Sequence, residues 1–161
     1  MKHWSGFAAA LLLALPGCSQ AQPTDPRSPL LLERTIPLPD TKGRIDHLAI
    51  DLAGHRLFVA EIANGTVDEI DLDAGKVIGR IVGLGEPQGV AWLAAERELV
   101  VACGDGSVHF YAADRHELAR INLGDDADNL RVDPRNGHVV VGYGKGGLAT
   151  IDPVRNTVLA R

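Results

Sequence analysis

The chain has 161 residues, of which 45% are hydrophobic and 23% charged, and its formal net charge is −5. This length accommodates one ordinary domain, and the composition is that of a globular protein rather than a disordered one. A mildly acidic chain lacks the electrostatic footprint of a nucleic-acid-binding protein, so no nucleic-acid partner is expected. Aromatic residues make up only 4% of the chain, so the core must be built from aliphatic side chains.

Residues 1–21 differ from the rest of the chain. Lys2 supplies a positive charge, and an apolar run extends from Gly6 to Leu15. A membrane-spanning helix requires about 20 apolar residues, so this shorter run predicts a signal peptide rather than an anchor. Residues 22–30, which follow it, are expected to form a linker.

Two cleavage sites compete at the end of this leader. Ser19-Gln20-Ala21 has small residues at the spacing that ordinary signal peptidase requires, whereas Leu15-Pro16-Gly17-Cys18 resembles a bacterial lipobox. In the second case Cys18 would carry lipid, although Pro16 departs from the usual lipobox residue. Both sites predict a periplasmic or otherwise extracytoplasmic protein, which would contact the membrane only through a lipid on Cys18.

Cys103 is the other cysteine of the chain. Because Cys18 is either removed or lipidated, no internal disulfide is expected in the exported chain. Cys103 ends an apolar run, and we interpret it as a small buried hydrophobic residue rather than as a catalytic thiol.

Three sequence columns recur at intervals of about 40 residues. They are Asp46–Asp51 with Gln88–Leu93 and Asp128–Asp133, Arg56–Ala60 with Glu98–Ala102 and His138–Gly142, and Thr66–Asp71 with Ser107–Ala112 and Gly147–Asp152. Each copy divides into four short runs rich in Val and Ile, separated by Gly, Asn and Asp, which predicts four antiparallel strands. In the first copy these strands are expected at about 46–51, 56–60, 66–71 and 76–82.

Four antiparallel strands per copy are typical of a blade of a β-propeller. The predicted fold class is therefore all-β, with about three four-stranded blades of an incomplete ring over residues 31–161. The repeats are placed at about 39–77, 78–120 and 121–161. Apolar runs without alternation, such as Val139-Val140-Val141, are explained if neighbouring blades cover both faces of a sheet.

The copies resemble the YVTN repeat of YncE-like bacterial propellers. The resemblance rests on the strand containing Arg56–Ala60, the Gly75-Lys76 turn and the stretch Gly85-Glu86-Pro87-Gln88-Gly89-Val90-Ala91, which leads into the second copy. The third copy lacks the proline at this place. The resemblance covers nearly all of the chain after the leader and implies a propeller fold, but its motifs indicate little about function.

The number of blades raises a question of completeness. Propellers usually have four to eight blades, so an arc of three is expected to leave an apolar face open at each end. The missing blades are expected from a longer chain, of which this sequence would be the N-terminal part, or from a second copy. Residues 31–37 resemble a fourth strand and are expected to pair with a partner or to lie along an edge.

Propeller ligands bind at the mouth of the central channel, beside the first strand of each blade. The polar residues at matching positions there are Asp46, His47, Gln88, Asp128 and Asn129, which form the candidate ligand site. Together with Asp126, several of these residues are ligand types that suit Ca²⁺ or Mg²⁺. A divalent metal at the channel mouth is thus an alternative to residues that merely hydrogen-bond between blades.

Two functions remain open at this stage. One is an exported binding or scaffold module that holds a small polar molecule or a protein partner at the channel face. The alternative is a propeller enzyme of the lactonase or quinoprotein-dehydrogenase type. No catalytic residues are assigned, no cofactor is evident, and no Ser-His-Asp grouping can be assembled from spacing, so the binding module is preferred.

Overall fold

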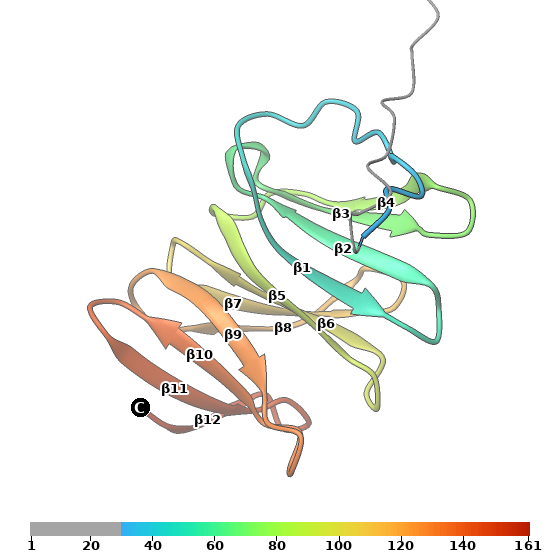
Figure 1. Ribbon diagram of the computed structural model, residues 1–161. Helices are drawn as coiled ribbons and strands as arrows, with labels where there is room; N and C mark the ends of the chain where they lie inside the picture. Colours follow the sequence, from blue (N-terminus) through green and yellow to red (C-terminus); the bar gives the residue numbers. More distant parts are fainter. Residues whose placement is uncertain (1–29) are drawn as a thin grey trace, which may run out of the picture. The chain divides into compact units, whose positions relative to one another are not determined.

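Twelve strands follow one another in the computed structural model, which describes residues 30–161 (Figure 1). They form three four-stranded sheets in which sequence neighbours pair antiparallel. Blade 1 consists of β1 (Ile45–Asp51), β2 (Arg56–Glu61), β3 (Thr66–Asp71) and β4 (Lys76–Ile81). Blade 2 consists of β5 (Pro87–Leu93), β6 (Glu98–Cys103), β7 (Ser107–Ala112) and β8 (Glu117–Asn122). Blade 3 consists of β9 (Ala127–Val132), β10 (Val139–Tyr143), β11 (Gly147–Asp152) and β12 (Thr157–Ala160).

The predicted all-β class is confirmed, as are the three four-stranded meanders, and the ring of blades is not closed. The described part also contains one short 3-10 turn, Ile62–Asn64, where the sequence predicted only a tight turn. Gly65 ends this turn with φ +65. Glycine adopts this left-handed conformation without strain because it has no Cβ atom. The predicted signal peptide, Cys18 and residues 22–29 of the predicted linker lie outside the described residues.

Aspartates set several of the turns between strands. The Asp51 carboxylate accepts hydrogen bonds from the amides of Ala53 and Gly54 at 3.2 and 3.0 Å. Asp71 and Asp152 repeat this arrangement after the third strands of blades 1 and 3, at 2.8–3.1 Å. A short acidic side chain that caps its own turn in this way reverses the chain and starts the next strand.

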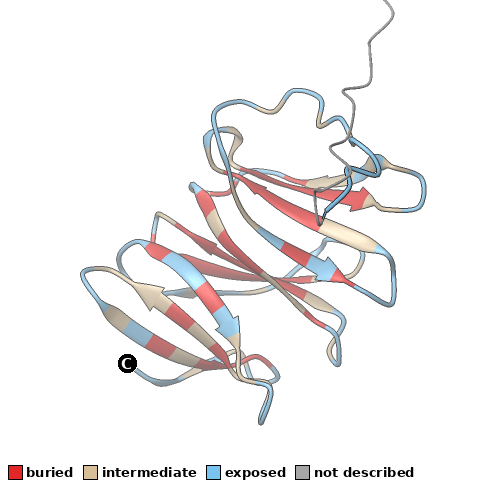
Figure 2. Ribbon diagram, viewed as in Figure 1, coloured by how far each residue is buried: buried red, intermediate tan, exposed pale blue. Residues whose placement is uncertain are grey.

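The core lies between blades. One cluster of buried side chains draws Phe58 from blade 1 and Leu99, Val101 and Cys103 from β6 of blade 2. A second cluster joins the opposite side of β6 to blade 3. Strand β6 is therefore apolar at successive positions because both of its faces are covered, and Figure 2 shows buried residues along it.

Blade 3 differs from blade 2 because one of its faces is open. Val139 and Val141 are fully buried toward blade 2, but Val140 is only half-buried. Together with Leu148, which is 64% exposed, Val140 lines a shallow hollow of about 210 Å³ on the other face. The run Val139-Val140-Val141 is thus covered on one side only in this chain.

Residues 35–44 run beside blade 1 without forming a strand. Thr41 donates a hydrogen bond to the buried Glu61 at 2.6 Å, and Asn64 donates to the Asp40 carbonyl at 3.0 Å. The strand expected near 31–37 is not present among residues 30–44. Each of the three sheets already has its fourth strand, so no described sheet offers that segment a vacant place.

Candidate functional site at the channel face

The first strands of the three blades, β1, β5 and β9, lie next to one another, with β5 in contact with both of the others (Figure 1). Gly89 makes this approach possible on β5. A Cβ atom placed on Gly89 would lie 2.1 Å from the carbonyl oxygen of Asp128, so only a residue without a side chain fits. We call the surface formed by Asp46, His47, Gln88, Asp128 and Asn129 the channel face.

Three of these five residues come together. One potential ligand atom from each of Asp46, His47 and Asp128 lies within 4.8 Å of the others, although blade 2 separates their strands in sequence. Asp46 and His47 are half-buried and Asp128 is exposed. No other group of three such side chains occurs in residues 30–161.

The hydrogen bonding of this group is incomplete. Nδ1 of His47 lies 3.4 Å from an Asp46 oxygen, but the geometry is not that of a hydrogen bond, and the buried Nδ1 atom has no hydrogen-bond partner. The Arg44 guanidinium lies 3.6 Å from an Asp46 oxygen, and the Arg44 side chain is 72% exposed. A buried polar atom without a hydrogen-bond partner lowers the stability of a fold by about 1–3 kcal/mol. Such an atom is therefore expected to have a partner, such as a ligand.

Gln88 and Asn129 have partners elsewhere on the channel face. Gln88 donates a hydrogen bond to Asp126 at 2.9 Å. Asn129 accepts one from Arg131 on its own strand. Asp126, Asp128 and Asn129 also line a hollow of about 280 Å³ beside β10 and β11. The five predicted residues are thus neighbours, but they do not all point at one centre.

A hydrogen-bonded chain of Ser107, His109 and Glu117 in blade 2 was not found from the sequence. Ser107 Oγ lies 2.8 Å from His109 Nε2, and His109 Nδ1 lies 2.8 Å from Glu117 Oε1. Ser107 and His109 occupy alternate positions of β7, so they share a face of the sheet. That alternation is a signal in the sequence, whereas the pairing with Glu117 on β8 depends on register.

Ser107, His109 and Glu117 are linked in the same order as the three residues of a hydrolase triad. Unlike those residues, they are not accessible to a substrate. Ser107 and His109 are only 2% and 4% exposed. Ser107 also donates its single hydroxyl proton to Asp105. Burial disfavours the charge on Asp105, but the hydrogen bonds from the Ser107 hydroxyl and amide outweigh it and lower the pKa of Asp105. The Ser107 hydroxyl is therefore already engaged, and we assign it to the stability of blade 2.

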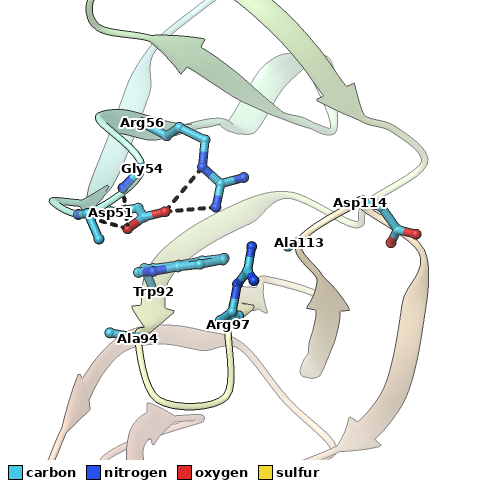
Figure 3. A pocket seen from close by; sticks show the side chains of 9 residues that line it. Asp51, Gly54, Arg56, Trp92, Ala94, Arg97, Ala113 and Asp114 are labelled. Carbon is cyan, nitrogen blue, oxygen red and sulfur yellow. Dashed lines mark hydrogen bonds and ion pairs between the residues drawn. The ribbon is translucent and has the colours of Figure 1, made fainter.

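A hollow of about 520 Å³ lies between blades 1 and 2 near the ends of β1 and β5 (Figure 3). Arg56 binds Asp51 at 2.7 Å and Glu69 at 2.7 Å, and its guanidinium lies 4.7 Å above the Trp92 ring. Arg115 from blade 2 also binds Glu69, at 2.6 Å. Because the buried charges are paired with one another, we interpret this region as a joint between blades.

The pairing shifts the titration of Asp51. Burial raises the cost of its charge, but hydrogen bonds from Arg56 and from the Gly54 and Ala53 amides outweigh burial, so the pKa of Asp51 is lowered. Trp92 also stacks on Phe58, with ring centroids 5.4 Å apart. Charge pairing and aromatic packing thus join blades 1 and 2 at the same place.

Cys103 is fully buried, in agreement with its interpretation as a core residue. Burial raises the pKa of the Cys103 thiol to about 12. In a Cys18→Ser background, native protein at pH 8 should react with a thiol-specific dye far more slowly than free cysteine, because only about one thiol in 10⁴ is ionised. The same protein in denaturant should react fully. Reaction of the native protein at the rate of free cysteine would contradict this expectation.

Comparisons with known proteins add evidence on the fold. No family model and no curated protein matches the chain. A solved structure of hydrazine synthase from Kuenenia stuttgartiensis is similar, with a TM-score of 0.68 and 20% sequence identity. The match covers 80% of this chain and 38% of that chain, so this chain spans well under half of the solved one. At this identity the likeness shows a β-propeller-like fold and nothing about activity.

In the part of the chain that the structure describes, no helix has the length and apolar character needed to cross a membrane.

Proposed function

We propose that the chain is an exported binding module, built from propeller blades, that holds a small polar molecule at the channel face. The observation that carries this proposal is the convergence of Asp46, His47 and Asp128 from blades 1 and 3. Two carboxylates and an imidazole placed together offer hydrogen-bond acceptors, a donor and negative charge to one ligand. Ligand sites are concave surfaces with a few convergent polar groups. A hollow of about 280 Å³ lies beside this group and shares Asp128 with it.

Export and family are parts of the same proposal. The apolar run that precedes Cys18 and Ala21 supports secretion, by cleavage either after Ala21 or before Cys18. The stretch from Gly85 to Ala91 supports a relationship to YncE-like YVTN-repeat propellers. The open face of blade 3, with Leu148 exposed, supports completion of the ring by further blades, from a longer chain or a second copy.

Fewer structural observations support the alternative that the protein is an enzyme. A lactonase or a quinoprotein dehydrogenase needs a reactive group that a substrate can reach. Among the described residues, Ser107, His109 and Glu117 are hydrogen-bonded in the order of a catalytic triad. The Ser107 hydroxyl, however, is buried and donates its hydrogen bond to Asp105. The channel-face residues are accessible but form no nucleophile–base pair. Binding is therefore the function that the geometry supports best.

Thermal unfolding in the presence of candidate ligands tests the binding function. A ligand that binds only the native state at 100 times its Kd adds about 2.7 kcal/mol of stability. We expect at least one member of a panel of sugars, sugar lactones, small carboxylic acids and divalent ions to raise the Tm by several degrees. The shift should be lost in Asp128→Asn and kept in His55→Ala, which changes an exposed histidine in a turn. A panel without any shift would contradict the proposal.

A further inference from the structure

The cluster of Asp46, His47 and Asp128 has a more specific chemistry than a general polar site. We propose that these three side chains bind one divalent transition-metal ion of the Zn²⁺ type and leave coordination positions open. The inference rests on the proposed function, since it names the ligand class of the same channel face. It differs from the Ca²⁺ or Mg²⁺ that the sequence left as an alternative, because imidazole nitrogen suits Zn²⁺ and its neighbours whereas Ca²⁺ and Mg²⁺ take oxygen.

The separations fit a shared ion. Zn²⁺ is bound at about 2.0–2.2 Å by nitrogen and carboxylate oxygen, which places two of its ligand atoms about 3–4 Å apart. The candidate atoms of Asp46, His47 and Asp128 already lie within 4.8 Å of one another. Small side-chain rotations would close the remaining gap, because Asp128 is exposed and free of the core. Three protein ligands with an open position are the pattern of zinc sites that also bind water or substrate.

The unsatisfied nitrogen of His47 points to the same ligand. Nδ1 of His47 is buried and makes no hydrogen bond, although Asp46 lies 3.4 Å away. A metal ion would occupy its lone pair and remove the cost of leaving it unpaired. The charges also agree, since two carboxylates balance a divalent cation. Arg44 approaches Asp46 only to 3.6 Å from an exposed position, so it can give way to the ion.

Two other histidine–aspartate pairs show what distinguishes this cluster. His55 lies 3.1 Å from Asp73, and His116 binds Asp114 at 2.5 Å. In both pairs the side chains are more than half exposed, and each pair lacks a third ligand of the kind that Asp128 supplies. They are therefore matched controls for the effect of a histidine and a carboxylate without a built site.

Titration with Co²⁺, a spectroscopic substitute for Zn²⁺, tests the inference on protein purified from the whole 161-residue chain and freed of metal with a chelator. We expect visible absorption from nitrogen-bound Co²⁺ that saturates at one ion per chain and is displaced by Zn²⁺. His47→Ala should abolish the absorption, and Asp128→Asn should weaken binding at least tenfold. His55→Ala should leave the titration unchanged. Tm values in chelator show whether each variant is folded.

The result separates this inference from the proposed function. Absence of a saturable Co²⁺ spectrum, or a spectrum that His47→Ala does not alter, overturns the metal site. If organic molecules of the panel still raise the Tm through Asp128, the binding function stands and only the metal is wrong. A Co²⁺ signal lost equally in His55→Ala would show adventitious surface binding and would also overturn the site.

Discussion

Replacing Arg56 by alanine is expected to lower the free energy of unfolding by about 3–5 kcal/mol, the usual cost of removing one partner from a buried ion pair. The Arg56 side chain is 16% exposed, and those of Asp51 and Glu69 are 8% and 4% exposed. Without Arg56 both carboxylates would be held near the core with reduced compensation. The contact of the guanidinium with the Trp92 ring, at 4.7 Å, would also be lost.

Equilibrium unfolding in urea at pH 7 measures this loss. Arg135→Ala is the matched control, because Arg135 pairs with Asp133 at 2.7 Å on the surface and is 86% exposed. Exposed pairs contribute little, so the control should unfold at nearly the wild-type urea concentration. If Arg56→Ala were as stable as Arg135→Ala, the ion network between blades 1 and 2 would not stabilise the fold.

The stability lost in Arg56→Ala should depend on pH, and it should become smaller as the pH falls. The pKa of Asp51 is lowered in the folded state, so its contribution is fully present above the unfolded pKa of about 3.9 and is lost as pH falls through the folded pKa. The wild type should therefore lose stability between about pH 5 and the acid limit. In Arg56→Ala much of that contribution is already absent, and the difference between the two proteins should narrow toward pH 3.

The strands could be predicted from the sequence because each depends on neighbours close along the chain. Val and Ile runs, Asp turns and Gly65 recur with the blade, and the structure places strands where the repeats predict them. The grouping of Asp46, His47 and Asp128 also follows from the repeat, since matching columns put them at matching points of β1 and β9. Whether they bind a ligand stays a prediction.

Side-chain contacts between strands and blades could not be predicted in this way. Arg115 reaches Glu69 across 46 positions of sequence, and Glu117 meets His109 through the register of β7 and β8. Such pairs depend on rotamers and on how blades stack, neither of which a repeat pattern encodes. For the same reason the sequence did not predict that the Gln88 amide donates a hydrogen bond to Asp126.

The second large effect is expected at Gly89, where alanine should destabilise the fold by about 3 kcal/mol, the upper part of the range for overpacked sites. The added Cβ would lie 2.1 Å from the Asp128 carbonyl oxygen and 3.2 Å from its carbon, so β5 and β9 would have to separate. Because both atoms belong to the backbone, rotation of a side chain cannot relieve the contact.

Gly142→Ala is the control for this substitution, since a Cβ there would meet its nearest atom, the Asn129 carbonyl oxygen, at an ordinary 3.7 Å. Urea unfolding should separate Gly89→Ala clearly from wild type, and Gly142→Ala far less. Movement of β9 would also displace Asp128 from Asp46 and His47, so Gly89→Ala should weaken Co²⁺ binding under conditions in which the protein remains folded. Equal stability of the two alanine variants would show that the blades can shift at β5 without loss of stability. In that case the close contact between β5 and β9 would not determine the position of the channel-face residues.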